Sequence, residues 1–315
     1  MNSITKTYKA YAKVNLALDV LRKRSDGYHD VKMVMQNIDI YDELEFIVTD
    51  IKKASDNSCE NAAHGEKTEQ NKSYAKPSCN IIIETNKPEI PTDESNLIHK
   101  AIKLMFDEYN VYGDVLVKLT KNIPMEAGMA GGSTDCAAAL KAVNDIFERN
   151  ASLEDLMRLG KRLGADVPFC LLGKTALAEG IGEILTEVQG LPDCTILVVK
   201  PAVGISTGMI YENMNCGELK SRPDIDGMLE GLRRHALGTV ASKMENVMET
   251  VTVKLCPDIE GIKNAMKEKG ALNAIMSGSG PTVFGIFDDF EKAWEAADYI
   301  GELDLATDIF VTKPV

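Results

Sequence analysis

A cluster of glycines and hydroxyl residues in the middle of the chain has the composition of a phosphate-binding loop. Glycines at 128, 131 and 132 precede Ser133 and Thr134 directly. Glycine lets the backbone bend tightly and leaves no Cβ between its N–H groups and a ligand. Apolar residues at helical spacing follow, and the free N–H groups and dipole at a helix start attract anions. Segment 123–140 therefore predicts a glycine loop that leads into a helix and binds phosphate.

The same pattern has a simpler interpretation, namely a tight turn that binds nothing. The loop has neither the Gly-Lys-Ser/Thr ending of a Walker motif nor the Gly-x-Gly-x-x-Gly spacing of dinucleotide-binding loops. Ser133 or Thr134 can also serve only as a helix cap, a position that both residue types favour. The loop by itself leaves these interpretations open.

A second set of polar residues lies on the first expected strand. Residues 8–20 are apolar at even positions and mostly polar at odd positions, which is typical of a strand with one buried face. Lys13 and Asn15 then lie on the same polar face. The Asp-Gly pair at 26–27 predicts a turn, and Tyr28 and His29 follow it.

The composition is that of a globular protein that does not bind nucleic acid. The chain has 315 residues, 44% apolar and 26% charged, and its formal charge of −13 disfavours nucleic acid and anionic membranes as partners. The seven cysteines do not have metal-ligand spacing. No apolar run approaches the roughly 20 residues of a membrane span, and no signal peptide is recognisable. We therefore expect a cytoplasmic protein with reduced thiols.

Strands and helices alternate along the chain in mixed order, which predicts an α+β protein with two domains. Their boundary is expected near Gly190, giving domains 1–190 and 191–315. The polar segment 51–78 is expected to be a mobile surface insertion between strands. The pattern near 238–248 predicts a helix.

Three clusters, at 12–15, 124–139 and 276–282, resemble in order and spacing the three motifs of the GHMP kinases. This superfamily includes galactokinase, homoserine kinase and mevalonate kinase. The resemblance extends from the first strand almost to the last. It implies a first domain like ribosomal protein S5 domain 2, a ferredoxin-like second domain, and an active site between them.

Within the superfamily, residues 12–16, 24–29, 163–169 and 178–185 are similar to kinases that act on a cytidine diphosphate derivative of 2-C-methyl-D-erythritol. These enzymes belong to the non-mevalonate route to isoprenoid precursors. The resemblance implies transfer of the γ-phosphoryl group of ATP to the 2-hydroxyl of the methylerythritol unit, with Mg²⁺ as cofactor. The chain departs from the family in the length of 51–78, in Thr134 for Ser and in Met129 for Leu.

The resemblance also assigns roles to individual residues. Asp166 is expected to be the general base, with Lys13 beside it. Substrate-binding residues are expected to be Asn15, Tyr28, His29, Thr207 and Tyr211, with Tyr28 and Tyr211 on either side of the base. Ser133 is the expected magnesium ligand. The ATP-binding residues are expected to be Pro124, Met125, Glu126, Ala127, Gly128, Met129, Ala130, Gly131, Gly132, Ser133 and Thr134.

Each of these residues also has an ordinary structural interpretation. Asp166 precedes an apolar segment, where aspartate is a common helix cap, and Lys13 can be a solvated charge at a strand edge. Two rival functions stay open as well. One is another GHMP kinase, for homoserine or mevalonate, although these lack the Asp-Gly-Tyr-His segment. The other is a non-catalytic nucleotide-binding regulator with the same fold, although both Lys13 and Asp166 are present.

Overall fold

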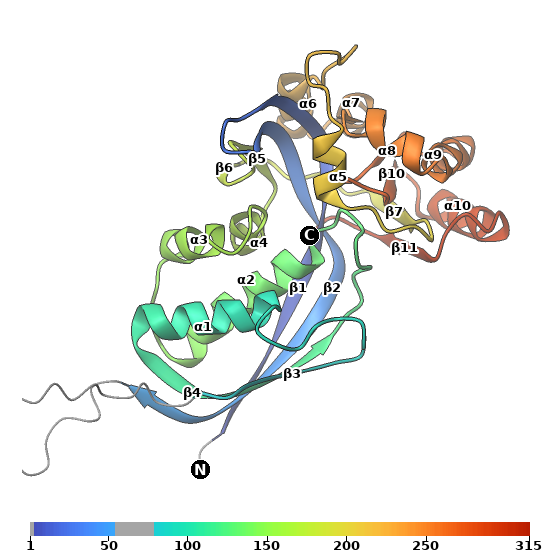
Figure 1. Ribbon diagram of the computed structural model, residues 1–315. Helices are drawn as coiled ribbons and strands as arrows, with labels where there is room; N and C mark the ends of the chain where they lie inside the picture. Colours follow the sequence, from blue (N-terminus) through green and yellow to red (C-terminus); the bar gives the residue numbers. More distant parts are fainter. Residues whose placement is uncertain (1–2, 54–78) are drawn as a thin grey trace, which may run out of the picture.

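The computed structural model describes residues 3–53 and 79–315, and within these the chain forms two sheets with helices packed on them (Figure 1). Most of the expected insertion at 51–78 lies outside the described residues. The chain passes from the first sheet to the second between β6 and β7, close to the expected boundary at Gly190. Because β8 returns to the first sheet, the division into 1–190 and 191–315 stays a prediction.

The first sheet has seven strands in the order β3-β4-β2-β1-β8, and β5 pairs with β2 and β6. Two long antiparallel strands, β1 and β2, form its centre, and bulges along β1 increase their twist. Strands β3 and β8 are parallel to their neighbours. The bounds are β1 Ile4–Lys23, β2 His29–Lys53, β3 Ile81–Thr85, β4 Val111–Thr120, β5 Ala176–Glu179, β6 Ile184–Glu187 and β8 Glu245–Asn246.

Helices α1 and α2 pack against the first sheet, and α3 and α4 pack on α2. Side chains cap the N-termini of α1 and α3. Asn96 accepts a hydrogen bond from the Ile98 amide, and Ser152 accepts one from the Asp155 amide. Buried residues of α1 and α2 share a core with β2 and β4. The bounds are α1 Leu97–Tyr109, α2 Gly131–Ile146, α3 Leu153–Lys161 and α4 Val167–Leu172.

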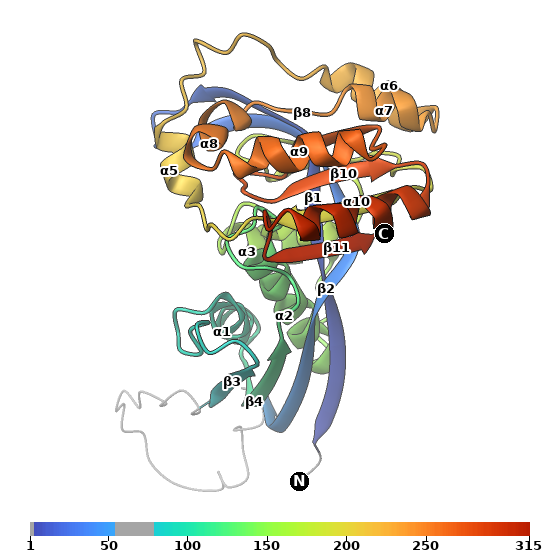
Figure 2. The same cartoon turned by 90° about the vertical axis from the view of Figure 1, so that its right-hand side faces the viewer.

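The second sheet is antiparallel, with strand order β11-β7-β10-β9. Helices α9 and α10 cover one face of it (Figure 2). The strands are β7 Thr195–Lys200, β9 Asn273–Met276, β10 Val283–Phe287 and β11 Asp308–Thr312. The helices are α5 Thr207–Glu212, α6 Ile225–Arg233, α7 Leu237–Ser242, α8 Glu249–Leu255, α9 Asp258–Glu268 and α10 Phe290–Glu302.

The structure corrects two expectations. Strand β1 is not buried on one face only, because residues 12–20 are buried at even and odd positions alike. Val14 and Leu16 pack with β7 of the second sheet, while α2 lies close to β1 as well. The helix expected near 238–248 is present only in its first part, since α7 ends at Ser242 and β8 follows. Pairing with β1 at Ala17 and Leu18 overrides the local helical pattern there.

Candidate active site

The predicted site residues meet in one cavity of about 750 Å³. It is lined from the first half by β1, the glycine loop and the residues before α4, and from the second half by α5 and loop 277–280. All of the predicted catalytic, ATP-binding and substrate-binding residues line this cavity except Thr134. Thr134 is buried beside Cys170 instead.

The glycine loop leads directly into α2, as expected. Its N-cap residue is Ala130 in the left-handed conformation, and no side chain caps the helix. Ser133 lies in the first turn rather than at the cap, so the interpretation of Ser133 or Thr134 as a mere cap is wrong. The backbone N–H groups of the first turn have no side-chain acceptor at the N-cap and border the cavity, which suits an anion.

The backbone of the glycine loop lies directly against the backbone of loop 277–280. Gly128 has φ +68°, and a Cβ built there would lie 2.2 Å from the Ser277 carbonyl oxygen. The hydroxyl of Ser277 donates a hydrogen bond to the Gly128 carbonyl, at 3.0 Å. A Cβ at Gly278 would in turn lie 2.9 Å from that carbonyl oxygen. Both loops therefore require glycine where they meet.

Sequence reasoning missed a buried charge cluster below the loop. Lys121 forms ion pairs with Asp42 and, at 2.8 Å, with Asp135 of α2. Asp42 also accepts the backbone N–H groups of Asn122 and Ile123, so it fixes the entry to the loop. Burial and the Asp42 charge hold the pKa of Asp135 well above its usual range, although Lys121 opposes this shift. The separation of Asp42 from Lys121 in sequence leaves no signal for this contact.

Lys13 and Asp166 approach each other across the cavity. Lys13 Nζ lies 4.0 Å from Asp166 Oδ2 and donates a hydrogen bond to Asn15 Oδ1 at 2.6 Å. Lys13 is buried, so it is not an edge charge in solvent. Its backbone N–H bonds to the Met129 carbonyl at 3.2 Å, which fixes the lysine relative to the glycine loop. Asp166 stands at the N-cap of α4 but its side chain makes no capping hydrogen bond, which leaves the carboxylate available to a ligand.

Aromatic rings line the other end of the cavity. His29 stacks on Tyr211 with ring centroids 4.9 Å apart, while Tyr28 is 58% exposed. Tyr28 and Tyr211 both line the cavity, and the ring that stacks on Tyr211 here is His29, so the sandwich of a base between Tyr28 and Tyr211 stays a prediction. Burial, and then the Lys23 charge, lowers the pKa of His29. The Thr207 hydroxyl is hydrogen-bonded to the Ser279 hydroxyl at 2.8 Å.

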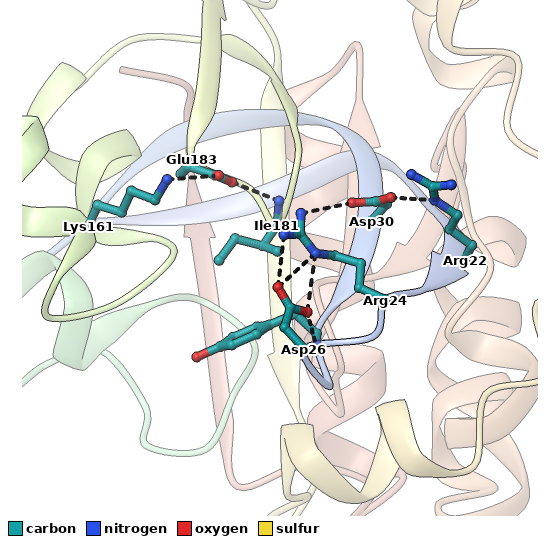
Figure 3. A network of polar contacts seen from close by, with 8 residues as sticks. Arg22, Arg24, Asp26, Asp30, Lys161, Ile181 and Glu183 are labelled. Carbon is teal, nitrogen blue, oxygen red and sulfur yellow. Dashed lines mark hydrogen bonds and ion pairs between the residues drawn. The ribbon is translucent and has the colours of Figure 1, made fainter.

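Ionic contacts hold the rim at this end (Figure 3). In the turn between β1 and β2, Arg24 pairs with Asp26 and Asp30, and Asp26 accepts the Tyr28 amide. The neighbouring turn between β5 and β6 is held by Glu183, which accepts hydrogen bonds from the Ile181 amide at 2.7 Å and from Lys161 at 3.1 Å.

A hydrogen bond from the Val31 amide, near the start of β2, to the Gly180 carbonyl joins β2 to the turn between β5 and β6. Ile181 and Tyr28 both line the cavity. Of the lining residues that sequence reasoning did not select, Lys23, Met33, Lys121, Ile181 and Met248 come from segments scattered along the chain.

Comparison with known proteins defines the class. The family model described as the GHMP kinases N terminal domain matches residues 96–174, and the GHMP kinases C terminal model matches residues 228–303. A homoserine kinase from Cytophaga hutchinsonii has a similar structure, with a TM-score of 0.73 at 18% identity over 99% of this chain and 95% of that one. The expected α+β fold of a GHMP kinase is thereby confirmed.

Closer relatives narrow the family. A 4-diphosphocytidyl-2-C-methyl-D-erythritol kinase from Lachnoclostridium phytofermentans is 47% identical, covering 92% of this chain and 90% of that protein. One from Lachnospira eligens is 44% identical, covering 97% and 96%. A crystal structure of 4-(cytidine 5'-diphospho)-2C-methyl-D-erythritol kinase superposes with a TM-score of 0.74 at 26% identity, covering 98% and 99%. The chain belongs to the family of 4-diphosphocytidyl-2-C-methyl-D-erythritol kinases.

Proposed function

We propose that this enzyme transfers the γ-phosphoryl group of ATP to the 2-hydroxyl of 4-diphosphocytidyl-2-C-methyl-D-erythritol. The observation that carries the proposal is the placement of Lys13 and Asp166 in the cavity that the start of α2 borders. Phosphoryl transfer depends mainly on positioning and charge stabilisation. An anion site at one end, a carboxylate–lysine pair and an aromatic end together suit a nucleotide donor and an acceptor that carries a base.

The donor is held by backbone groups. The glycine loop and the first turn of α2 bind the triphosphate through N–H groups and the helix dipole. Mg²⁺ bound to nucleotide phosphates keeps several waters and takes few protein ligands. The part of the chain that the structure describes has no cluster of three or more acidic, histidine or cysteine ligands, which fits a metal that arrives with ATP, with the Ser133 hydroxyl as its protein ligand. When bound, Mg²⁺ would offset the negative charge of the phosphates.

Asp166 accepts the proton of the acceptor hydroxyl while the oxygen attacks the γ-phosphorus and ADP leaves. Lys13, at 4.0 Å from Asp166, places a positive charge beside the carboxylate and orients the hydroxyl. Asn15 holds Lys13 in place through its hydrogen bond of 2.6 Å. How far the proton has moved when the phosphoryl group transfers depends on how loose the transition state is.

The cytidyl group binds at the aromatic end. Stacking of a base on an aromatic face contributes about 1–3 kcal/mol in nucleic-acid systems. His29 already stacks on Tyr211 at 4.9 Å, so we place the base against this pair, with Tyr28 closing the mouth. Thr207 lines the same cavity and is hydrogen-bonded to Ser279.

Acceptor choice is the decisive test, because the fold alone resembles homoserine kinase as closely as it does the cytidyl kinase. ADP release should be measured with MgATP and, separately, the cytidyl substrate, homoserine and mevalonate. We expect turnover with the cytidyl substrate only. Turnover with homoserine or mevalonate would support the rival kinases, and no turnover with any acceptor would support a nucleotide-binding regulator.

Asp166→Asn tests the proposed base. The amide cannot take up the proton, so we expect kcat to fall by about 10²–10⁴-fold, the usual range for loss of a general base. The affinity for MgATP, measured by calorimetric titration, should stay close to that of the unmodified enzyme because Asp166 does not contact the glycine loop in the proposed arrangement. Near-normal turnover would remove Asp166 as the base.

A further inference from the structure

Three side chains around the start of α8 hold the loop that touches both ends of the active site. Asn246 ends β8, while Glu249 and Thr252 lie on α8, three residues apart in sequence. Each of the three makes hydrogen bonds to the backbone of residues 276–279.

Asn246 makes the most contacts of the three. Its Nδ2 donates to the carbonyl oxygens of Met276 and Gly278, at 2.8 Å each, and its Oδ1 accepts the Met248 amide at 3.0 Å. The side chain is buried, and its residue pairs with Leu18 of β1. Asn246 therefore ties the loop to the strand that carries Lys13 and Asn15.

Glu249 and Thr252 fix the two sides of the same loop. Glu249 Oε1 accepts the Met276 amide at 2.7 Å, and its Oε2 pairs with Lys263 at 2.5 Å. The fully buried Thr252 hydroxyl has two carbonyl acceptors within reach, Met248 at the start of α8 at 3.1 Å and Ser279 of the loop at 3.2 Å. Amide and carbonyl groups on both sides of the turn are thus held by side chains, so the turn has little freedom to shift.

The loop held in this way contacts both halves of the site. Ser277 donates to the Gly128 carbonyl of the glycine loop at 3.0 Å. Ser279 bonds to Thr207 of α5 at 2.8 Å. Gly278 and Ser279 also line the cavity directly. A shift of the loop would move the phosphate-binding side and the acceptor side relative to each other.

We propose that Asn246, Glu249 and Thr252 are positioning residues, which set the distance between bound ATP and the acceptor through loop 277–279. The proposal rests on the phosphoryl-transfer function proposed above. Reaction geometry is sensitive to small displacements, because reacting atoms must be held within a narrow range of separation. Loss of one of these hydrogen bonds should therefore lower turnover more than it lowers stability.

Thr252→Val and Thr252→Ser form the test pair. Valine keeps the shape of the side chain and removes the hydroxyl, whereas serine keeps the hydroxyl. We expect Thr252→Val to lower kcat/KM by about tenfold or more, as for a lost hydrogen bond to a buried group. Thr252→Ser should recover activity to within about twofold. Steady-state kinetics with both substrates varied, run well below the melting temperature of each variant, measures this.

Asn246→Asp and Glu260→Gln complete the set. Aspartate places a charged oxygen against the Met276 and Gly278 carbonyls, so we expect a larger loss of kcat than for Thr252→Val. Glu260 pairs with the same Lys263 at 2.8 Å but does not contact the loop, so Glu260→Gln should leave kcat and both KM values unchanged.

A purely structural role predicts a different outcome, namely a lower melting temperature with normal kcat and KM at low temperature. That result for Thr252→Val, or equal losses for Thr252→Val and Thr252→Ser, would overturn the proposal. Failure of the proposed function is seen separately, as absence of turnover by the unmodified enzyme.

Discussion

At the scale of single residues, the site depends on charges that are buried but paired. Lys13 and Lys121 are both nearly inaccessible, and Lys13 faces the carboxylate of Asp166 while Lys121 faces those of Asp42 and Asp135. A buried charge is costly unless it is paired. The cavity therefore has cations at fixed positions, whereas flexible surface lysines would have to be ordered when the substrate binds.

Lys121→Met and Asp135→Asn should differ strongly in stability. Removal of Lys121 leaves Asp42 and Asp135 buried without a cation, which should cost about 3–5 kcal/mol of unfolding free energy. Asp135→Asn leaves Lys121 paired with Asp42, so its amide should cost no more than about 1–2 kcal/mol. Urea unfolding of both variants measures the difference, and equal losses would contradict this account of the cluster.

His29 should titrate below the ordinary histidine pKa of about 6.5, because burial and the Lys23 charge lower its pKa. The unfolded chain then binds the proton more readily than the folded one. His29 should cost no stability above pH 6.5, and stability should fall as the pH drops below that value. Imidazole resonances in a pH titration by NMR give the midpoint, with His29→Gln used for assignment. A midpoint at or above 6.5 would show that burial and the Lys23 charge do not disfavour the charged ring.

At the scale of elements, the site is built where two glycine-containing loops meet. The first strand, the glycine loop and loop 277–280 each supply backbone groups, and backbone contacts such as the Lys13 amide to the Met129 carbonyl set their spacing. Glycine at 128 and 278 permits an approach that any side chain would prevent. The kinase site is thus defined by backbone approach as much as by the catalytic side chains.

Gly128→Ala and Gly173→Ala distinguish the effect of backbone strain from the effect of the contact between the two loops. Both glycines have nearly the same conformation, φ +68° and +66°, but a Cβ at Gly173 meets nothing within 4 Å. Each substitution should cost about 1–2 kcal/mol of stability for the left-handed backbone. Only Gly128→Ala, whose Cβ would overlap the Ser277 carbonyl, should also reduce kcat/KM, by about tenfold or more. Kinetics that change equally in both variants would rule out the contact as the cause.

At the scale of the whole molecule, the two sheets do not have separate cores. One buried cluster contains Leu18 and Phe169 of the first half with Leu197 of the second. Another contains Val14 with Ile196. If either half unfolded alone, the buried apolar surface that it shares with the other half would be exposed to water, so the two halves should unfold together.

We therefore expect a single cooperative unfolding transition. The chain has one tryptophan, Trp294, which lies on α10 against Phe290 and reports on the second half. Far-UV circular dichroism reports on helices and strands of both halves. Urea midpoints from the two signals should coincide. Two separated transitions would show that the halves unfold independently and that the shared clusters contribute little.

The sequence predicted the structure best where a motif and the element that carries it lie in one contiguous segment. The glycine loop and the helix after it are local, so their residue types and spacing predicted them well, and the extended strand around Lys13 is in the same position. It was least successful where distant pairing decides the local structure. The segment at Glu245–Asn246 has a helical pattern but pairs with β1 as a strand, and its role in holding loop 277–279 was missed for that reason.

The sequence by itself determined the class of protein and predicted the residues of its site, because phosphate binding by a glycine loop depends on a short contiguous segment. The tertiary structure decided which of those residues meet and how they are held. Lys13 and Asp166 are 153 positions apart, the Asp42–Lys121–Asp135 cluster joins three elements, and Asn246 reaches loop 277–279 across the molecule. Such contacts depend on strand pairing and shared cores, and a local pattern of residue types does not specify them.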